Sequence, residues 1–289
     1  MVKALRGSAR LSAAFGLAAL GCFGSPTPLA PSLRGSVGLP HQGVLTDAVE
    51  LPLIGPGFAR YRPFGSRNYG TPLLVGAITR AAAKVEQDAP GGKALVVGDL
   101  SARSGGKVSG HASHRTGRDV DLLYYVTTLT NIPVRSPGFI HFGADGLARS
   151  ASGEYLRLDE RRIWLLIRAL LTDSEAEVLW IFASRNVEAF VTNYARSMGE
   201  PATLIHRAIQ VLQEPRDSAN HDDHLHVRIA CSAAERFAGC ESGGPAWAWL
   251  RDVETQQVAL DYQFDTEPSS DESTAPSDKN LQTRQPGNY

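Results

Sequence analysis

The chain has 289 residues, enough for one sizeable domain or two small ones. Charged residues make up 20 % of it and hydrophobic residues 43 %, an ordinary balance for a globular protein. The formal net charge is −1, so nothing in the composition indicates a protein that binds nucleic acid or another polyanion.

Residues 1–21 are typical of an export signal. Lys3, Arg6 and Arg10 give a positive start, and the apolar run "LSAAFGLAALGCFG" follows them. This run is short for a helix that spans a bilayer. A buried core helix is the alternative, but it would not need the basic residues in front of it. The sequence therefore predicts export to the periplasm. Removal of the signal takes away positive charges only, which leaves a mildly acidic chain.

Residues 22–45 are rich in Pro, Gly and Ser and are expected to form a tether. Cys22 ends the apolar run in "AALGC", which resembles the cleavage box of bacterial lipoproteins, although Ala19 stands where leucine is usual. Two outcomes stay open. Either a lipid on Cys22 attaches the protein to a membrane, or ordinary cleavage takes place nearby.

One continuous domain is expected over residues 46–263, because no linker interrupts it. Amphipathic or capped segments predict helices, and short apolar runs predict buried strands. The helices are expected at 70–92, 158–174, 185–199 and 203–215, and the strands at 94–101 and 177–184. Since helices and strands do not alternate regularly, the sequence favours the α+β class. Residues 264–289 contain almost no large apolar side chains and are expected to be a disordered tail.

The stretch "HDDHLHVRIA" (221–230) holds three of the chain's eight histidines. A strand here would place its apolar side chains on one face and, on the other, His224, His226 and Arg228. Histidines two apart on a strand point the same way, whereas on a helix they diverge. One imidazole can therefore bind a metal while the other faces a water on that metal. His206, within an expected helix, indicates an ordinary core or surface histidine instead.

The stretch "HASHRTGRDVDLLYY" (111–125) supplies the other half of a metal site. Alternation puts Asp119 and Asp121 on one side of a strand, where two inward carboxylates are costly without a partner such as a cation. His114 lies seven residues before Asp121, with "RTG" as a turn between them. His114, Asp121 and one histidine of His-x-His make three ligands with a fourth position open, as in catalytic zinc sites. The helical His-Glu-x-x-His motif is absent from the chain.

These residues carry a family resemblance. A histidine, six residues, an aspartate and, about a hundred residues later, His-x-His is the ligand pattern of the LAS metallopeptidases. Longer strings, over roughly residues 50–240, resemble one branch of that superfamily, the penicillin-insensitive murein endopeptidases. The strings are "RYRPFGSRNYGTP", "VVGDLSARSGGKVSGHASHRTGRDVDL" and "HDDHLHVRIAC".

The resemblance implies a fold, a site and a substrate. The fold would be a small antiparallel sheet that carries the metal site and is flanked by helices. One zinc ion would be bound by His114, Asp121 and His226, and His224 would be the catalytic base. The substrate would be peptidoglycan, hydrolysed at the D-alanyl–meso-diaminopimelate cross-link by a zinc-activated water.

Three more residues acquire a role through the resemblance. His111 and His221 match further histidines that line the cleft in this branch. A second, weaker metal site near His111 would need an Asp-Gly-x-His motif. Here Asp145 is followed, three residues on, by alanine, so the motif for a second zinc is incomplete.

Arg228 is expected on the metal-facing side of its strand, where it could hold a substrate carboxylate or pair with Asp222 or Asp223. Apart from it, the sequence shows no obvious cationic pair for a C-terminal carboxylate. Two alternatives to the endopeptidase stay open: a D,D-carboxypeptidase of the same superfamily, and a catalytically inactive zinc-bearing module that binds the cell wall. The presence of both His224 and His226 argues against the inactive module, because ligation needs only one.

Cys231 and Cys240 lie nine residues apart just after the histidines. In a chain bound for an oxidising compartment, this spacing favours a local disulfide. Two buried thiols are the alternative.

Overall fold

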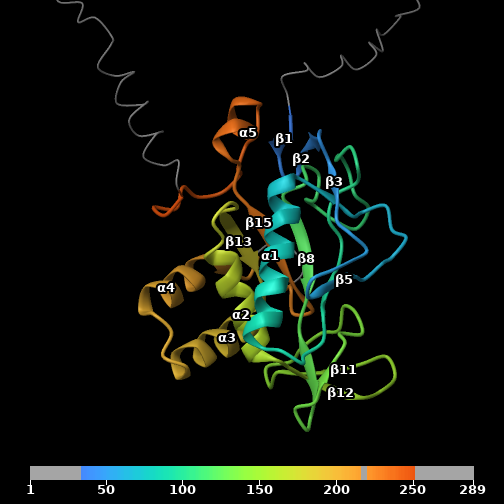
Figure 1. Ribbon diagram of the computed structural model, residues 1–289, viewed down its shortest axis with the longest axis vertical. Coiled ribbons are helices and arrows are strands. Elements are labelled where there is room, and N and C mark those ends of the chain that lie inside the picture. Colours follow the sequence, from blue (N-terminus) through green and yellow to red (C-terminus); the bar gives the residue numbers. More distant parts are fainter. Residues whose placement is uncertain (1–33, 216–219, 251–289) are drawn as a thin grey trace, which may run out of the picture. The chain divides into compact units, whose positions relative to one another are not determined.

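The computed structural model describes residues 34–215 and 220–250 (Figure 1). The expected export signal, Cys22, the first part of the expected tether and the expected tail at 264–289 lie outside the described residues. None of the helices in the described part has both the length and the apolar character needed to cross a membrane.

A seven-stranded sheet runs through the domain in the order β14-β13-β15-β8-β7-β5-β4. The four central strands, β13, β15, β8 and β7, pair antiparallel, while β14 and β5 each run parallel to their one central neighbour. The strands are β4 (Ile54–Gly55), β5 (Phe58–Arg60), β7 (Leu95–Val97), β8 (Asp119–Leu123), β13 (Val178–Phe182), β14 (Leu212–Gln213) and β15 (His224–Ile229). The expected α+β fold with an antiparallel sheet at its centre is confirmed.

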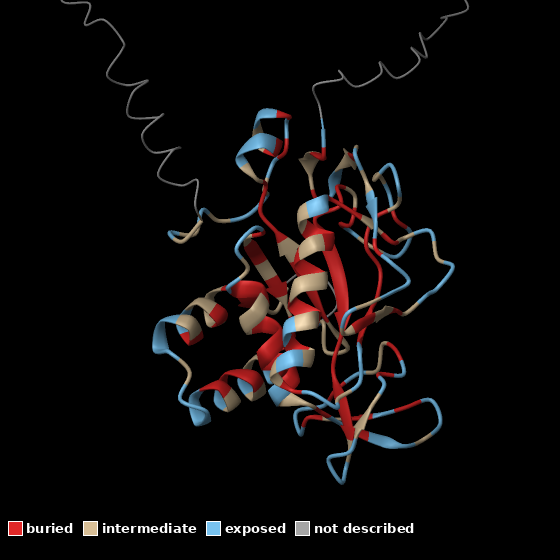
Figure 2. Cartoon of the chain, viewed as in Figure 1, coloured by how far each residue is buried: buried red, intermediate tan, exposed pale blue. Residues whose placement is uncertain are grey.

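The four long helices follow one another in packing order, α1 against α2, α2 against α3 and α3 against α4 (Figure 1). Their buried faces form one core with the apolar side of the sheet, and Figure 2 shows the buried residues of these elements in red. The helices, including a short fifth one, are α1 (Pro72–Asp88), α2 (Glu160–Leu171), α3 (Arg185–Ser197), α4 (Ala202–Val211) and α5 (Ala233–Phe237).

Local sequence explains where the helices begin and end. The hydroxyl of Thr71 accepts from the backbone N–H of Leu74 at the start of α1, and Asp159 caps α2 in the same way. The expected helix at 203–215 ends at Val211, before Pro215, because Leu212 and Gln213 join the sheet as β14 beside β13.

Smaller sheets surround this core. A four-stranded sheet has the order β10-β9-β12-β11, and two antiparallel pairs, the hairpin β1-β2 and the pair β3-β6, lie in the N-terminal part of the domain. Their strands are β1 (Ser36–Leu39), β2 (Gln42–Leu45), β3 (Val49–Glu50), β6 (Tyr69–Gly70), β9 (Val126–Thr128), β10 (Pro133–Val134), β11 (Leu147–Arg149) and β12 (Tyr155–Leu158).

The prediction of a tether is wrong for residues 36–45, because these residues form the β1-β2 hairpin of the folded domain. The hydroxyl of buried Ser36 accepts from Arg118 Nε at 2.9 Å, and Leu45 is buried. Gly38 has a φ of 79°, which glycine adopts without strain, and Pro40 stands at the turn. The residues that indicated a tether therefore serve a tight hairpin, and the domain begins before residue 46.

A disulfide joins Cys231 and Cys240, as the sequence predicts. The disulfide connects the end of β15 to the segment after α5. In that segment, the backbone of Cys240 forms an isolated parallel β-bridge with Gly38 of β1. The strand that carries two of the expected site histidines is thus fastened to the N-terminal hairpin.

Candidate metal centre

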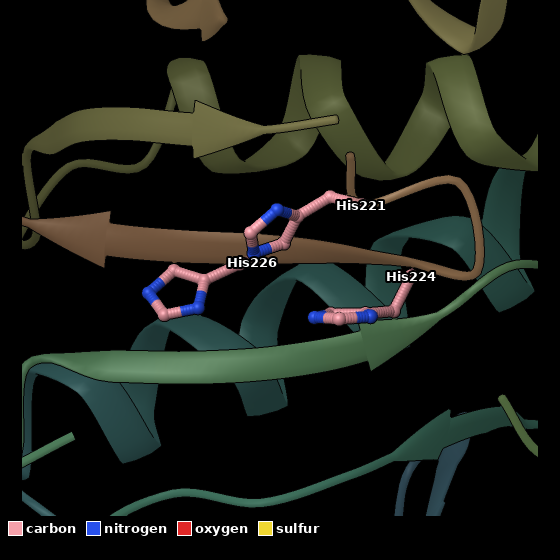
Figure 3. Close-up of side chains that lie close together, drawn as sticks. All are labelled: His221, His224 and His226. Carbon is pink, nitrogen blue, oxygen red and sulfur yellow. The ribbon is translucent and has the colours of Figure 1, made fainter. Parts of the chain in front are cut away.

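Two adjacent central strands, β8 and β15, position the expected site residues. In their antiparallel register, Asp121 lies directly opposite His226. Leu225 and Val227 point into the core shared with the helices, so His224 and His226 face the other side of the sheet. Figure 3 shows both imidazoles on that side, with His221 reaching toward them from the loop before β15.

Three donor atoms converge at this face. His114 Nε2 lies 3.2 Å from Asp121 Oδ1 and 3.3 Å from His226 Nδ1, and His226 Nδ1 lies 3.2 Å from Asp121 Oδ1. Zinc ligands at about 2.0–2.1 Å from a tetrahedral centre are separated by about 3.3–3.4 Å. The three atoms therefore already have the spacing of three corners of a tetrahedral zinc site.

The carboxylate of Asp121 fits a cation in a second respect. It is fully buried, and neither of its oxygens accepts a hydrogen bond from the described residues. Burial raises the pKa of Asp121, but His114 and the two histidines of β15 outweigh burial and hold that pKa well below its ordinary value. A buried, ionised carboxylate without hydrogen bonds is costly unless a cation binds it. Two imidazole nitrogens and one carboxylate oxygen are a donor set that suits zinc.

Asp119 orients His226. The Nε2–H of His226 donates to Asp119 Oδ1 at 2.9 Å, which leaves the Nδ1 lone pair directed at His114 and Asp121. Arg228 Nε donates to the same oxygen at 2.6 Å. Burial raises the pKa of Asp119, but Arg228 and His226 outweigh it and lower that pKa. The sequence predicted that Asp119 shares a strand face with Asp121 but gave Asp119 no role. The alternation in Asp-x-Asp was the signal that could have identified it as a partner of the metal ligands.

His224 lies beside the three donors and is held by its neighbour. Its Nδ1 donates to Asp223 Oδ1 at 2.6 Å, and its Nε2 lies 3.3 Å from Asp121 Oδ1. Burial lowers the pKa of His224, but Asp121 and Asp223 outweigh burial and raise that pKa to about 9. The His221 ring is 4.9 Å from that of His224, and the backbone of His221 is left-handed with a φ of 50°.

The site opens into a pocket of about 600 Å³. Its lining includes all the expected histidines of the site, Asp121 and Arg228, together with the aromatic side chains of Phe139 and Phe182. Phe139 packs edge-on against His224, and Phe182 against His226, at centroid distances of 5.2 and 5.5 Å. The two aromatic rings therefore form part of the pocket wall beside these imidazoles.

Asp99 is among the pocket residues that the sequence did not single out, together with Arg62, Arg67, Phe139 and Phe182. Asp99, just after β7, accepts from His111 Nε2 at 3.0 Å, from Arg62 at 2.6 Å and from Arg67 at 3.0 Å. The only sequence signal was a "GD" at the end of an apolar strand. Since His111 Nδ1 also lies 3.8 Å from Asp121 Oδ2, His111 stands between the two carboxylates.

Two further expectations can be compared with the geometry. Asp145 is exposed and caps a turn by accepting from the backbone N–H of Leu147 at 3.1 Å, and it does not line the pocket with His111. Arg228 pairs with Asp119, so the alternative of a pair with Asp222 or Asp223 is wrong. Among the described residues, two groups of three bring metal-binding atoms within 4.8 Å: His111, His114 and Asp121, and His221, His224 and His226.

Comparison with known proteins agrees with this geometry. A family model described as penicillin-insensitive murein endopeptidase matches residues 36–137. A penicillin-insensitive murein endopeptidase of Klebsiella pneumoniae subsp. pneumoniae is 30 % identical over 213 residues, which cover 73 % of this chain and 70 % of that protein. Proteins of the same name from Haemophilus influenzae and Escherichia coli K12 are each 26 % identical, over 76 % and 70 % of this chain and 71 % and 69 % of their own length. The chain belongs to the penicillin-insensitive murein endopeptidase family of peptidases.

Proposed function

We propose that this protein is a zinc-dependent endopeptidase that hydrolyses the D-alanyl–meso-diaminopimelate cross-link of peptidoglycan in the periplasm. The observation that carries the proposal is the convergence of His114 Nε2, Asp121 Oδ1 and His226 Nδ1 at mutual distances of 3.2 to 3.3 Å. The names of the relatives supply murein as the substrate class. Export through residues 1–21 and a lipid on Cys22 remain predictions.

His114, Asp121 and His226 would hold the zinc ion, and Asp119 would keep His226 in the tautomer that presents Nδ1. Bound zinc supplies a Lewis acid that polarises the scissile carbonyl and lowers the pKa of water from about 15.7 toward 7. His114, Asp121 and His226 line the pocket, so a zinc ion held by them would be reachable from it, as a catalytic rather than a structural site requires.

His224 would move the proton. Its Nε2 faces the same space as the three donors, while Asp223 holds its Nδ1–H and so fixes the ring. Once Asp121 shares its charge with a cation, His224 loses one of the two carboxylates that raise its pKa, which favours the neutral form that a base needs. It would then accept a proton from the attacking water and donate it to the leaving amine.

Hydrolysis by a water that His224 deprotonates needs no acyl-enzyme. β-Lactams act by acylating a serine nucleophile, so penicillin should leave the activity unchanged. His221 and His111, which line the same pocket, are suited to hydrogen-bond the oxyanion or the substrate backbone.

The decisive experiment digests purified peptidoglycan with the full chain and follows cross-linked dimers and monomers by chromatography. We expect dimers to become monomers, with the activity lost to a chelator, restored by zinc and unchanged by penicillin. Loss of D-alanine from pentapeptides while dimers persist would instead identify a D,D-carboxypeptidase. Binding without any hydrolysis in the zinc-loaded protein would identify a wall-binding module.

A further inference from the structure

Two arginine side chains in the pocket share one carboxylate. Arg62 and Arg67 each donate one N–H to Asp99, at 2.6 and 3.0 Å, and no other described residue accepts a side-chain hydrogen bond from either of them. Asp99 is 7 % exposed, whereas Arg62 and Arg67 are 51 % and 33 % exposed. Both side chains line the pocket, and because a guanidinium carries five N–H donors, Asp99 uses only a minority of them.

The charges at this end of the pocket do not balance. The single carboxylate of Asp99 faces two guanidinium groups, those of Arg62 and Arg67. Arg228, the arginine singled out from the sequence, is paired one-to-one with Asp119 instead. The surplus positive charge of the pocket wall thus lies at Arg62 and Arg67.

This charge lies next to the proposed reaction centre. The Arg62 guanidinium stacks over Phe139, with Cζ 6.0 Å from the ring centroid, and the same ring packs against His224 at 5.2 Å. On the other side, His111 connects Asp99 to Asp121. One side chain, that of Phe139, therefore separates Arg62 from the proposed base. Two side chains, those of Asp99 and His111, separate both arginines from the proposed metal ligand Asp121.

We propose that Arg62 and Arg67 bind the substrate carboxylate that sits on the carbon next to the scissile nitrogen. This rests on the proposed function. In a D-alanyl–meso-diaminopimelate cross-link, the acylated amine and a free carboxylate share one carbon of the diaminopimelate. The leaving group thus carries a negative charge two bonds from the scissile nitrogen. A guanidinium pair preassembled on Asp99 provides the forked donors that recognise a carboxylate.

The test compares two cross-linked dimers, one with this carboxylate free and one with it converted to a primary amide. With the wild-type, zinc-loaded protein we expect amidation to raise KM by about tenfold to a hundredfold with little change in kcat, the scale of a charged hydrogen-bonded contact. Equal KM values for the two dimers would overturn the proposal, and this arm needs no variant.

A double variant, R62Q with R67Q, completes the cycle. We expect its KM for the dimer with the free carboxylate to be as high as the KM of wild type for the amidated dimer. Amidation should not raise the KM of the double variant further. The R62K and R67K variants should recover part of the difference, because lysine keeps the charge but not the fork. The matched control is R185Q: Arg185 is exposed on α3, pairs with Glu188 and does not line the pocket. If amidation raised the KM of the folded double variant as much as it raises that of wild type, Arg62 and Arg67 would not be the carboxylate-binding residues.

Titration of both dimers into the metal-free full chain separates this proposal from the proposed function. Weaker binding of the amide, abolished in the double variant, supports the carboxylate subsite even if the loaded protein hydrolyses neither dimer, in which case only the proposed function fails. Hydrolysis of both dimers with equal KM and equal binding would leave the endopeptidase intact and remove the subsite.

Discussion

Asp119 and Asp121 lie two residues apart on one face of β8 and are buried alike, yet their surroundings differ. Asp119 accepts hydrogen bonds from His226 and Arg228, whereas neither oxygen of Asp121 accepts one from the described residues. A carboxylate that is already hydrogen-bonded orients other groups, and one that is not is available to a cation. The residue type is the same, and the difference in role comes from the contacts alone.

Replacing Asp119 by asparagine should weaken metal binding while leaving the three donor residues in place. An asparagine oxygen can still accept from His226, but without the charge that makes imidazole a better ligand, so we expect a loss of about 10–100-fold in zinc affinity. Competition with a chromophoric chelator measures it. Asp145→Asn, on an exposed turn away from the pocket, is the control and should bind zinc as wild type does. Equal affinities in the two variants would contradict a role for Asp119.

The two histidines of β15 should separate metal binding from proton transfer. We expect His226→Ala to lose the metal, and His224→Ala to keep most of it while the rate falls by about 10²–10⁴, the usual scale for general acid–base catalysis. Metal content and turnover of the same samples give both quantities. His206→Ala, at an exposed position on α4, controls for the loss of an imidazole. A metal-free His224→Ala protein would reverse the two assignments.

Sequence reasoning at this scale reached the residues that the alternation of a strand exposes. Asp121, His224 and His226 could be named because the apolar residues between them fix which face of its strand each occupies. His114 lies before β8 and was reached through the turn that follows it and through the family ligand pattern. Asp99 could not, because its partners Arg62 and Arg67 lie more than thirty residues away along the chain and meet it only in the folded pocket. Contacts between distant segments have no local signal.

Among the elements, the N-terminal hairpin β1-β2 is the one whose sequence misleads. Its glycines and proline indicate a tether, yet they shape a turn that brings Ser36 to Arg118. Helices α1 to α4 were predictable because their apolar residues recur at helical spacing and three of them begin at a capping side chain. A four-residue strand offers too few positions for such a pattern.

Two truncations test whether the hairpin belongs to the domain. A chain that begins at residue 34 should unfold like the full chain, whereas one that begins at residue 46 should be less stable by at least about 2 kcal/mol. The second loses the burial of Leu45 and the hydroxyl partner of the buried Arg118 guanidinium. Urea denaturation gives the unfolding free energies. Equal unfolding free energies of the two truncated chains would mean that residues 34–45 do not contribute to the folded domain, as expected of a tether.

For the whole molecule, the pH dependence of stability reports on contacts that join the helices. Asp173, after α2, accepts from Arg80 of α1 at 2.7 and 2.8 Å. Burial raises the pKa of Asp173, but the hydrogen bonds from Arg80 and from backbone N–H groups outweigh burial and lower that pKa. The folded protein therefore favours the ionised form. The resulting stability is present above the pKa of the unfolded chain, about 3.9, and is lost as pH falls through the lower folded value.

We expect Asp173→Asn to lower the unfolding free energy at neutral pH by about 1–2 kcal/mol, less than a fully buried pair because Arg80 is 36 % exposed. Below about pH 3 the difference from wild type should shrink, because wild-type Asp173 is then becoming protonated. Urea midpoints from about pH 7 to about pH 2 measure this. Asp47→Asn, in an exposed pair with Arg34, is the control. A difference that stays constant with pH would assign the effect to packing rather than to charge.

The register between β8 and β15 has a consequence for how this chain tolerates insertions. Asp121 faces His226 because the two strands pair at that register, and not because about a hundred residues lie between them. Loops within that interval can therefore gain or lose residues without altering the ligand distances, provided the strands still pair. A single-residue deletion inside β15 has the opposite effect, since it would turn the imidazoles toward the core. The spacing between the donor atoms of Asp121 and His226 is thus set by the hydrogen-bond repeat of the sheet.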